Sequence, residues 1–120
     1  RLVKSMDSLA TKNGAKLHVA YIPANFEVYP ELAAKAFPLG TYIPSVLPGG
    51  FGGYICNKIE RQSRVACLDL TKKMSFAIKN STTSRDMLLS KNFLYPAHGE
   101  IHLSKSGSKF SADMIYRFTQ

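Results

Sequence analysis

The sequence predicts an α+β domain in which one or two N-terminal helices pack on a mainly C-terminal antiparallel sheet of about five strands. Two observations lead to this prediction. Apolar residues near the start of the chain recur at helical spacing. Two later stretches, residues 54–70 and 98–118, instead alternate between apolar and polar residues around turn-forming residues. Because helices and strands are segregated along the chain, we expect an α+β rather than an alternating α/β arrangement.

Two helices are expected before the sheet. Residues 2–12 place Leu2, Met6 and Leu9 at helical spacing. A helix this short is marginal alone, so we expect its apolar stripe to dock on the rest of the domain. The second helix is expected over residues 30–37, where Pro30 suits the first helical position.

The sheet is expected to begin with a strand over residues 16–22 and to continue with a hairpin over residues 54–70. Residues 74–79 alternate as a further strand. The last two strands are predicted to form a hairpin over residues 98–118, which turns at Ser106-Gly107. The intervening residues 86–95 fit either a short helix or a strand.

The 120 residues are expected to form a single domain, residues 1–120. Residues 38–53 contain three prolines and five glycines and predict an ordered surface loop, because apolar residues keep interrupting the segment. Its glycines match neither the P-loop nor the dinucleotide-binding pattern, so nucleotide binding is not expected. Since the chain begins at Arg1 without Met, we expect a processed form or a fragment.

The two cysteines, Cys56 and Cys67, lie directly opposite each other if the first hairpin has a four-residue turn at residues 60–63. Opposed Cβ atoms of an antiparallel pair come close enough for a disulfide. A structural disulfide predicts a secreted or periplasmic protein, with two buried cytosolic thiols as the alternative. Two thiols alone do not complete a zinc site.

Positive charge is in excess, with 16 Lys and Arg against 8 Asp and Glu, and it concentrates in residues 58–91. This balance predicts an anionic partner, RNA or polysaccharide, although a merely basic surface is the alternative. Tyr54 and Phe76 are expected to be core aromatics rather than surfaces for base stacking. The expected anion-binding residues are Lys58, Arg61, Arg64, Lys72, Lys73 and Arg117.

His98, Glu100 and His102 share one face of the first strand of the C-terminal hairpin, with Asp113 expected opposite Glu100. This pattern indicates acid–base catalysis, in which Glu100 is the base and His98 or His102 the acid. A metal site formed by the two histidines and a carboxylate is a second interpretation, and a solvated polar face is the third. No cofactor is expected for the catalytic interpretation.

Asn80-Ser81-Thr82 is an N-glycosylation sequon, which matters only in a eukaryotic secretory protein. No apolar run approaches the length of a membrane-spanning helix.

Together these patterns predict a secreted or periplasmic basic domain that binds an anionic polymer, RNA first. Whether the domain is an enzyme stays open, and a metal-independent, ribonuclease-like activity is the form that catalysis would take. The alternative is a non-enzymatic interaction protein, such as a host-directed virulence effector, an adhesin or pilus-type subunit, or an inhibitor. It would contact a host or partner protein through residues 38–53.

Overall fold

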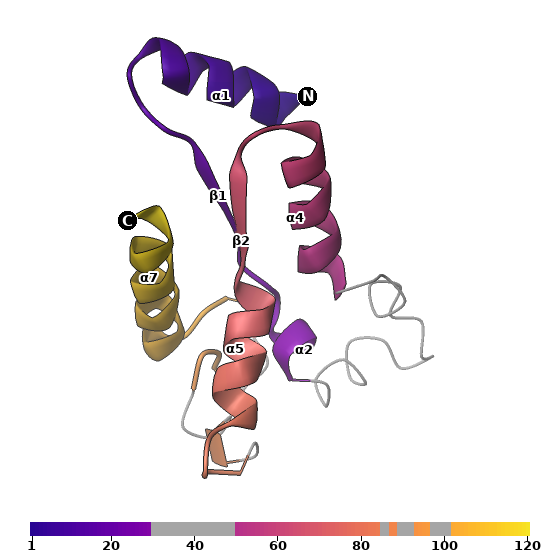
Figure 1. Cartoon of the computed structure of the whole chain (residues 1–120). Coiled ribbons are helices and arrows are strands. Elements are labelled where there is room, and N and C mark those ends of the chain that lie inside the picture. Colours follow the sequence, from indigo (N-terminus) through magenta and orange to yellow (C-terminus); the bar gives the residue numbers. More distant parts are fainter. Residues whose placement is uncertain (30–49, 85–86, 89–92, 97–101) are drawn as a thin grey trace.

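The structure, a computed structural model, describes residues 1–29, 50–84, 87–88, 93–96 and 102–120. Helices dominate the described part and occur along its whole length (Figure 1). The prediction of N-terminal helices on a five-stranded antiparallel sheet is therefore wrong. The described elements, in chain order, are α1 (Leu2–Lys12), β1 (His18–Tyr21), α2 (Asn25–Val28), α4 (Gly50–Gln62), β2 (Ala66–Asp69), α5 (Leu70–Lys79) and α7 (Lys105–Thr119).

Within the described residues, the strands β1 and β2 form one sheet, and they run parallel. His18 pairs with Ala66 at one end of the register, and Tyr21 pairs with Asp69 at the other. Parallel neighbours need a long crossover between them, and the chain between these strands includes α4. Figure 1 shows α4 on one side of the strand pair and α7 on the other.

The predicted hairpin over residues 54–70 is instead the helix α4 followed by β2. The alternation that indicated two strands was too short to distinguish the two-residue period of a strand from the period of about 3.6 residues of a helix. The continuous apolar run at residues 65–68 fits a strand that is covered on both sides, as parallel strands usually are. The predicted strand over residues 16–22 is confirmed as β1, and the helix over residues 2–12 is confirmed as α1.

The predicted C-terminal hairpin is also wrong, because residues 105–119 form the helix α7. Ser104 caps this helix by accepting a hydrogen bond from the backbone N–H of Gly107 at 3.1 Å. The Ser106-Gly107 pair, expected as a hairpin turn, therefore lies in the first helical turn. Phe110 and Met114, which pack against the core, are four residues apart, a spacing that fits both a helix and alternation.

Residues 74–79, predicted as a strand, belong to α5. The buried positions Leu70, Met74 and Ile78 are again four residues apart. Phe76, which alternation would place with them in the core, is 69% exposed. The helical period therefore decides which side chains are buried.

The core lies where α2 and α5 meet the segment before α7. Tyr29 donates a hydrogen bond to the carbonyl of Phe93 at 2.8 Å, and Tyr95 donates one to the carbonyl of Pro23. α7 approaches so closely that a Cβ on Gly107 would overlap the carbonyl of Leu94. The buried core residues are Val28, Tyr29, Leu70, Met74, Ile78, Leu88, Leu94 and Tyr95.

Three predicted segments fall wholly or mainly outside the described residues. These are the helix over residues 30–37, most of the loop over residues 38–53, and the first arm of the C-terminal hairpin.

Candidate functional site

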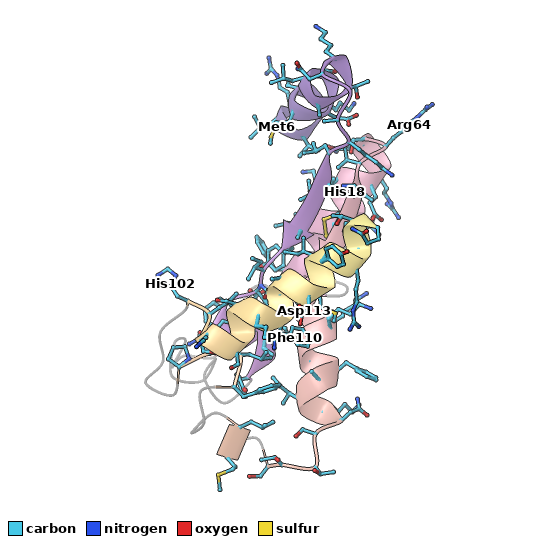
Figure 2. The ribbon with its side chains drawn as sticks, turned by 90° about the vertical axis from the view of Figure 1, so that its left-hand side faces the viewer. Met6, His18, Arg64, His102, Phe110 and Asp113 are labelled. Atoms are coloured by element: carbon cyan, nitrogen blue, oxygen red, sulfur yellow. A yellow bond between two sulfur atoms is a disulfide. The ribbon has the colours of Figure 1, made fainter. Side chains whose placement is uncertain are left out.

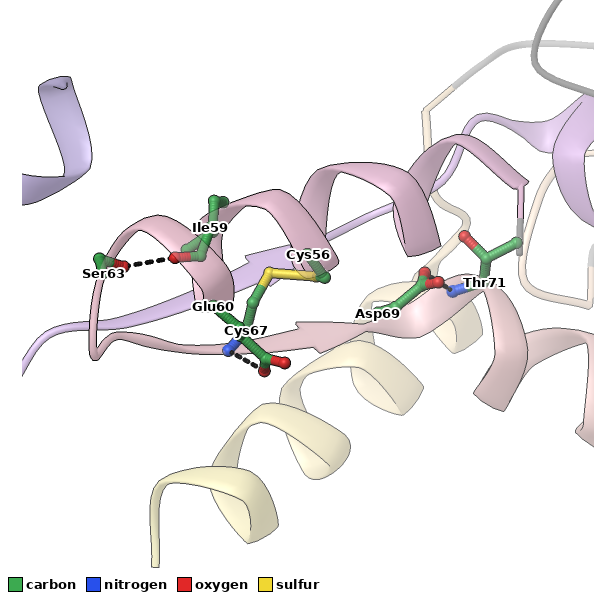
Figure 3. Close-up of a disulfide and its surroundings, with 7 residues drawn as sticks. All are labelled: Cys56, Ile59, Glu60, Ser63, Cys67, Asp69 and Thr71. Atoms are coloured by element: carbon green, nitrogen blue, oxygen red, sulfur yellow. Dashed lines mark hydrogen bonds between the residues drawn. A yellow bond between two sulfur atoms is a disulfide. The ribbon is translucent and has the colours of Figure 1, made fainter. Parts of the chain in front are cut away.

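One side of α4 is fixed to the strand pair by a disulfide and a hydrogen bond. Cys56 on α4 pairs with Cys67 on β2, with their Cα atoms 5.2 Å apart, which confirms the predicted disulfide (Figure 3). One turn further along, Glu60 accepts a hydrogen bond from the backbone N–H of Cys67 at 3.1 Å. The cysteines are thus bridged from helix to strand rather than across a hairpin.

The first turn of α4 also lies close to the strands, because Gly52 has no side chain. A Cβ at this position would lie less than 3.0 Å from the Asp69 carboxylate and from the ring of Tyr21. Asp69 also caps α5 by accepting a hydrogen bond from the N–H of Thr71 at 3.0 Å. Gly52, Cys56 and Glu60 are spaced by four residues and so form one side of α4, called here the inner face.

The opposite side of α4, called here the outer face, is formed by Tyr54, Asn57, Lys58 and Arg61, which recur at helical spacing. Tyr54 is 44% exposed, so the expectation that it belongs to the core is wrong. Asn57, Lys58 and Arg61 are also exposed. A groove of about 400 Å³ runs along this face, and its described lining residues are Gly53, Tyr54, Asn57, Lys58, Arg61 and Gln62.

The outer face is positively charged. Glu60 is the single acidic residue in the α4 sequence, and its carboxylate lies on the inner face. Arg61 in the last turn is favoured by the helix dipole, which concentrates negative potential at a helix C-terminus. The outer face therefore presents two cations beside an aromatic ring with no acid of its own.

The charge continues from α4 toward α1. A smaller hollow of about 130 Å³ lies between these helices, where Arg1 and Lys4 of α1 approach Lys58. Arg64 is exposed in the turn after α4 (Figure 2). Arg1 and Lys4 were not among the predicted anion-binding residues, and the helical spacing of α1 alone does not indicate which element it approaches.

The other predicted anion-binding residues are exposed but lie on different elements. Lys72 and Lys73 occupy the first turn of α5, which begins where β2 ends, whereas Arg64 precedes β2. Arg117 is near the end of α7, on the other side of the strand pair from α4 (Figure 1). The structure thus places Lys58 and Arg61 on one face of α4 and Arg64 in the turn that follows, whereas the remaining three predicted residues lie on other elements.

Of the predicted catalytic residues, His98 and Glu100 lie outside the described residues. His102 is exposed just before α7, beside a hollow of about 520 Å³ that Pro23 and Ser108 also line. Asp113 is on the helix α7, so the strand face that was to carry these groups is not formed by residues 105–119. The catalytic assignment of His98, Glu100 and His102 stays a prediction.

His102 is far from the turn after α4 that carries Arg64, called here the basic turn. Figure 2 shows His102 at the N-terminal end of α7 and Arg64 beyond its C-terminal end. Phe118 at that C-terminal end packs edge-on against His18, whose strand partner is Ala66. About 22 Å of helix, at the usual rise of about 1.5 Å per residue, therefore separates His102 from the basic turn.

The described residues bear on two further classes of site, a metal centre and a glycosylation site. No group of three histidine, cysteine or acidic side chains lies close enough together there to hold a metal ion. Asn80 is exposed at the C-terminus of α5, where its side chain donates a hydrogen bond to the carbonyl of Phe76. Its sequon is thus on the surface, and glycosylation stays a prediction.

None of the described helices has the length and apolar character needed to cross a membrane. No protein-family model matches the chain, and neither the curated proteins nor the solved structures contain a match to it.

Proposed function

We propose that this protein binds a single-stranded anionic polymer, RNA before polysaccharide, along the outer face of α4. The observation that carries the proposal is the placement of Tyr54, Lys58 and Arg61 on one exposed face along a groove. Tyr54 stacks on a base while Lys58 and Arg61 contact neighbouring phosphates, which is the usual combination in sequence-tolerant binding of single strands.

The dimensions of the outer face suit a short stretch of polymer. From Tyr54 to Arg61 the helix rises by about 10 Å, which is the length of about three stacked nucleotides. The disulfide, Glu60 and Gly52 hold the inner face against the strands. The outer face is thereby presented in a fixed orientation, which lowers the entropy lost on binding.

RNA is favoured over an acidic polysaccharide because of Tyr54. A polysaccharide that is recognised by charge needs the cations but gains nothing from stacking on a flat ring, whereas every nucleobase offers a π-face. Binding without cleavage is favoured because the described residues that line the groove include no histidine and no acid that could act as a general acid or base.

We place this function outside the cytosol, in a secreted or periplasmic protein. The support is the pairing of Cys56 with Cys67, because structural disulfides persist in oxidising compartments.

The test compares two double variants that remove the same charge. Binding of the full chain to a short single-stranded RNA is measured by fluorescence anisotropy at about 50 mM and about 200 mM salt. Lys58→Ala with Arg61→Ala should weaken binding about tenfold and lower the salt slope by about 1.4, the value for two lost phosphate contacts. Lys72→Ala with Lys73→Ala should leave both quantities nearly unchanged.

A second pair of variants separates stacking from charge. Tyr54→Leu should weaken RNA binding several-fold without changing the salt slope, since stacking is worth about 1–3 kcal/mol per base. Tyr116→Leu, at an exposed tyrosine of α7, is the matched control. Equal losses in both charge variants would show that only net charge matters. No effect of Tyr54→Leu on RNA binding, together with tighter binding of heparin that Lys58→Ala with Arg61→Ala weakens, would favour the polysaccharide.

A further inference from the structure

The helix α1 leaves its apolar stripe uncovered. Leu2, Met6 and Leu9 follow one another at helical spacing and are 73%, 47% and 65% exposed. No residue of α1 is buried. Figure 1 shows the helix at one end of the molecule, and Figure 2 shows Met6 at this projecting end. The expectation that this stripe docks on the rest of the domain is therefore wrong.

An exposed stripe on so short a helix has an energetic consequence. Isolated helices below about 12–15 residues are marginal in water, because the nucleation cost is spread over few hydrogen bonds. α1 has 11 residues, and its N-cap residue, Arg1, makes no side-chain capping hydrogen bond. Val3, Asp7 and Ala10 on another side of the helix are half-buried, and Val3 lines the hollow with Ile55 and Ile59 of α4. The side that carries Leu2, Met6 and Leu9 stays free, and whatever covers it would stabilise α1 further.

The charges around the stripe indicate what covers it. Arg1, the N-cap residue, and Lys12 are exposed and lie about a quarter of a turn from the stripe, whereas Lys4 lies on the opposite side of the helix. Lys16 follows the helix and is also exposed. Asp7 is the single acidic residue of α1, and it is half-buried. A helix with an apolar stripe that is bordered on one side by cations has the composition of helices that lie in the interface of an anionic membrane.

A second copy of this chain fits the stripe less well. Two copies would bring together the same cations and the same net charge of +8. Specific dimers bury about 1,200 Å² or more, and a helix about 16 Å long provides only a small part of that area. A lipid surface requires no such shape complementarity, and its negative charge matches the cations.

We propose that α1 docks on an anionic lipid bilayer, with Leu2, Met6 and Leu9 at the boundary between headgroups and acyl chains. Arg1 and Lys12, which border the stripe, then interact with the anionic headgroups. This inference is independent of RNA binding by α4, since it depends on a different helix and on apolar rather than aromatic contacts.

The experiment is flotation of the full chain with vesicles of phosphatidylcholine alone or with about one-third phosphatidylglycerol. The wild-type protein should float with the anionic vesicles and remain mostly unbound with the neutral ones. Replacing Leu2, Met6 and Leu9 together with serine should reduce the bound fraction on anionic vesicles about tenfold. Phe76→Ser, at an exposed aromatic residue of α5, is the matched control and should bind like the wild type.

Two further measurements keep the result unambiguous. Arg1→Glu with Lys12→Glu should also abolish flotation, while Lys58→Ala with Arg61→Ala should retain more than half of it. This difference separates docking by α1 from RNA binding by α4. Circular dichroism of each variant checks that it is folded. Undiminished flotation of the triple variant would overturn the proposal. Dimerisation in light scattering that the triple variant abolishes, without vesicle binding by the wild type, would assign the stripe to a second copy instead.

Discussion

Glu60 accepts a hydrogen bond from the backbone N–H of Cys67, the same residue that forms a disulfide with Cys56 one turn earlier on α4. The carboxylate therefore lies on the side of the helix that faces β2 (Figure 3). Because it is the single acid of α4, the opposite side keeps its full positive charge.

This relationship predicts the effect of Glu60→Gln. A glutamine keeps the oxygen that accepts the hydrogen bond, so the free energy of unfolding should change by less than about 1 kcal/mol. Because the Glu60 carboxylate lies on the other side of α4 from Lys58 and Arg61, removing its charge should raise the affinity for RNA by no more than about twofold, even at low salt. Anisotropy titrations measure the affinity. A weaker affinity in Glu60→Gln would contradict the account of the outer face.

The disulfide should contribute substantially to stability. In the chain-entropy model, a bridge over a sequence separation of 11 residues stabilises the folded state by about 3 kcal/mol. Replacing both Cys56 and Cys67 with serine should lower the free energy of unfolding by about that amount in urea titrations. A reductant should destabilise the wild type and leave the double variant unchanged. An equal response of both proteins to reductant would show that the bridge does not form in solution.

Tyr95 predicts a loss of stability at alkaline pH. Burial raises the pKa of its phenol well above the ordinary value of 10.0, with smaller contributions from Glu27 and Tyr29. The unfolded chain therefore releases this proton above about pH 10 while the folded chain keeps it. Stability from this group is complete below about pH 10 and falls above it by about 1.4 kcal/mol per pH unit, until the folded pKa is reached.

The urea midpoint of unfolding, measured between pH 8 and pH 11, tests this dependence, because that range spans the ordinary tyrosine pKa of about 10. Tyr95→Phe should show a shallower alkaline decline. At neutral pH it should lose about 1–3 kcal/mol, since the buried carbonyl of Pro23 loses its donor. Tyr116→Phe, at an exposed position, should follow the wild type at every pH. A wild-type stability that stays level through pH 11 would rule out this role for Tyr95.

The sequence was sufficient for features that depend on local spacing or on a single pair of residues. The helical stripe of Leu2, Met6 and Leu9 predicted α1, and the strand over residues 16–22 was confirmed as β1. The pairing of Cys56 with Cys67 was predicted through a hairpin that does not exist. It held because residues about eleven apart are also close when a helix turns back into a strand.

The sequence misled where apolar residues are spaced by four. A spacing of four residues is twice the strand period and also about one helical turn, so it fits one side of either element. This spacing separates the buried residues of α5, Leu70, Met74 and Ile78, and it separates Phe110 from Met114 in α7. The deciding residues lie between them. Phe76 and Tyr116 would be buried in strands, yet both are exposed. Their exposure depends on long-range packing, which one sequence does not reveal.

Only part of the candidate site was predicted, because the stretch that forms α4 was interpreted as a strand. Lys58, Arg61 and Arg64 were selected by their charge, and helical geometry places Lys58 and Arg61 on one face of α4, with Arg64 in the turn that follows. Lys72, Lys73 and Arg117 were grouped with them by composition alone, and the fold separates them. Tyr54 was assigned to the core because strand alternation placed it there, whereas the helical period turns it outward.

The most direct test of the account is to map where RNA contacts the protein. A short single-stranded RNA containing photoreactive thiouridine is cross-linked to the full chain, and the modified peptides are identified by mass spectrometry. We predict cross-links at Tyr54 and elsewhere within Gly50–Gln62, which disappear in Lys58→Ala with Arg61→Ala. Cross-links confined to α5 or α7 would contradict the assignment of the outer face of α4 as the binding surface.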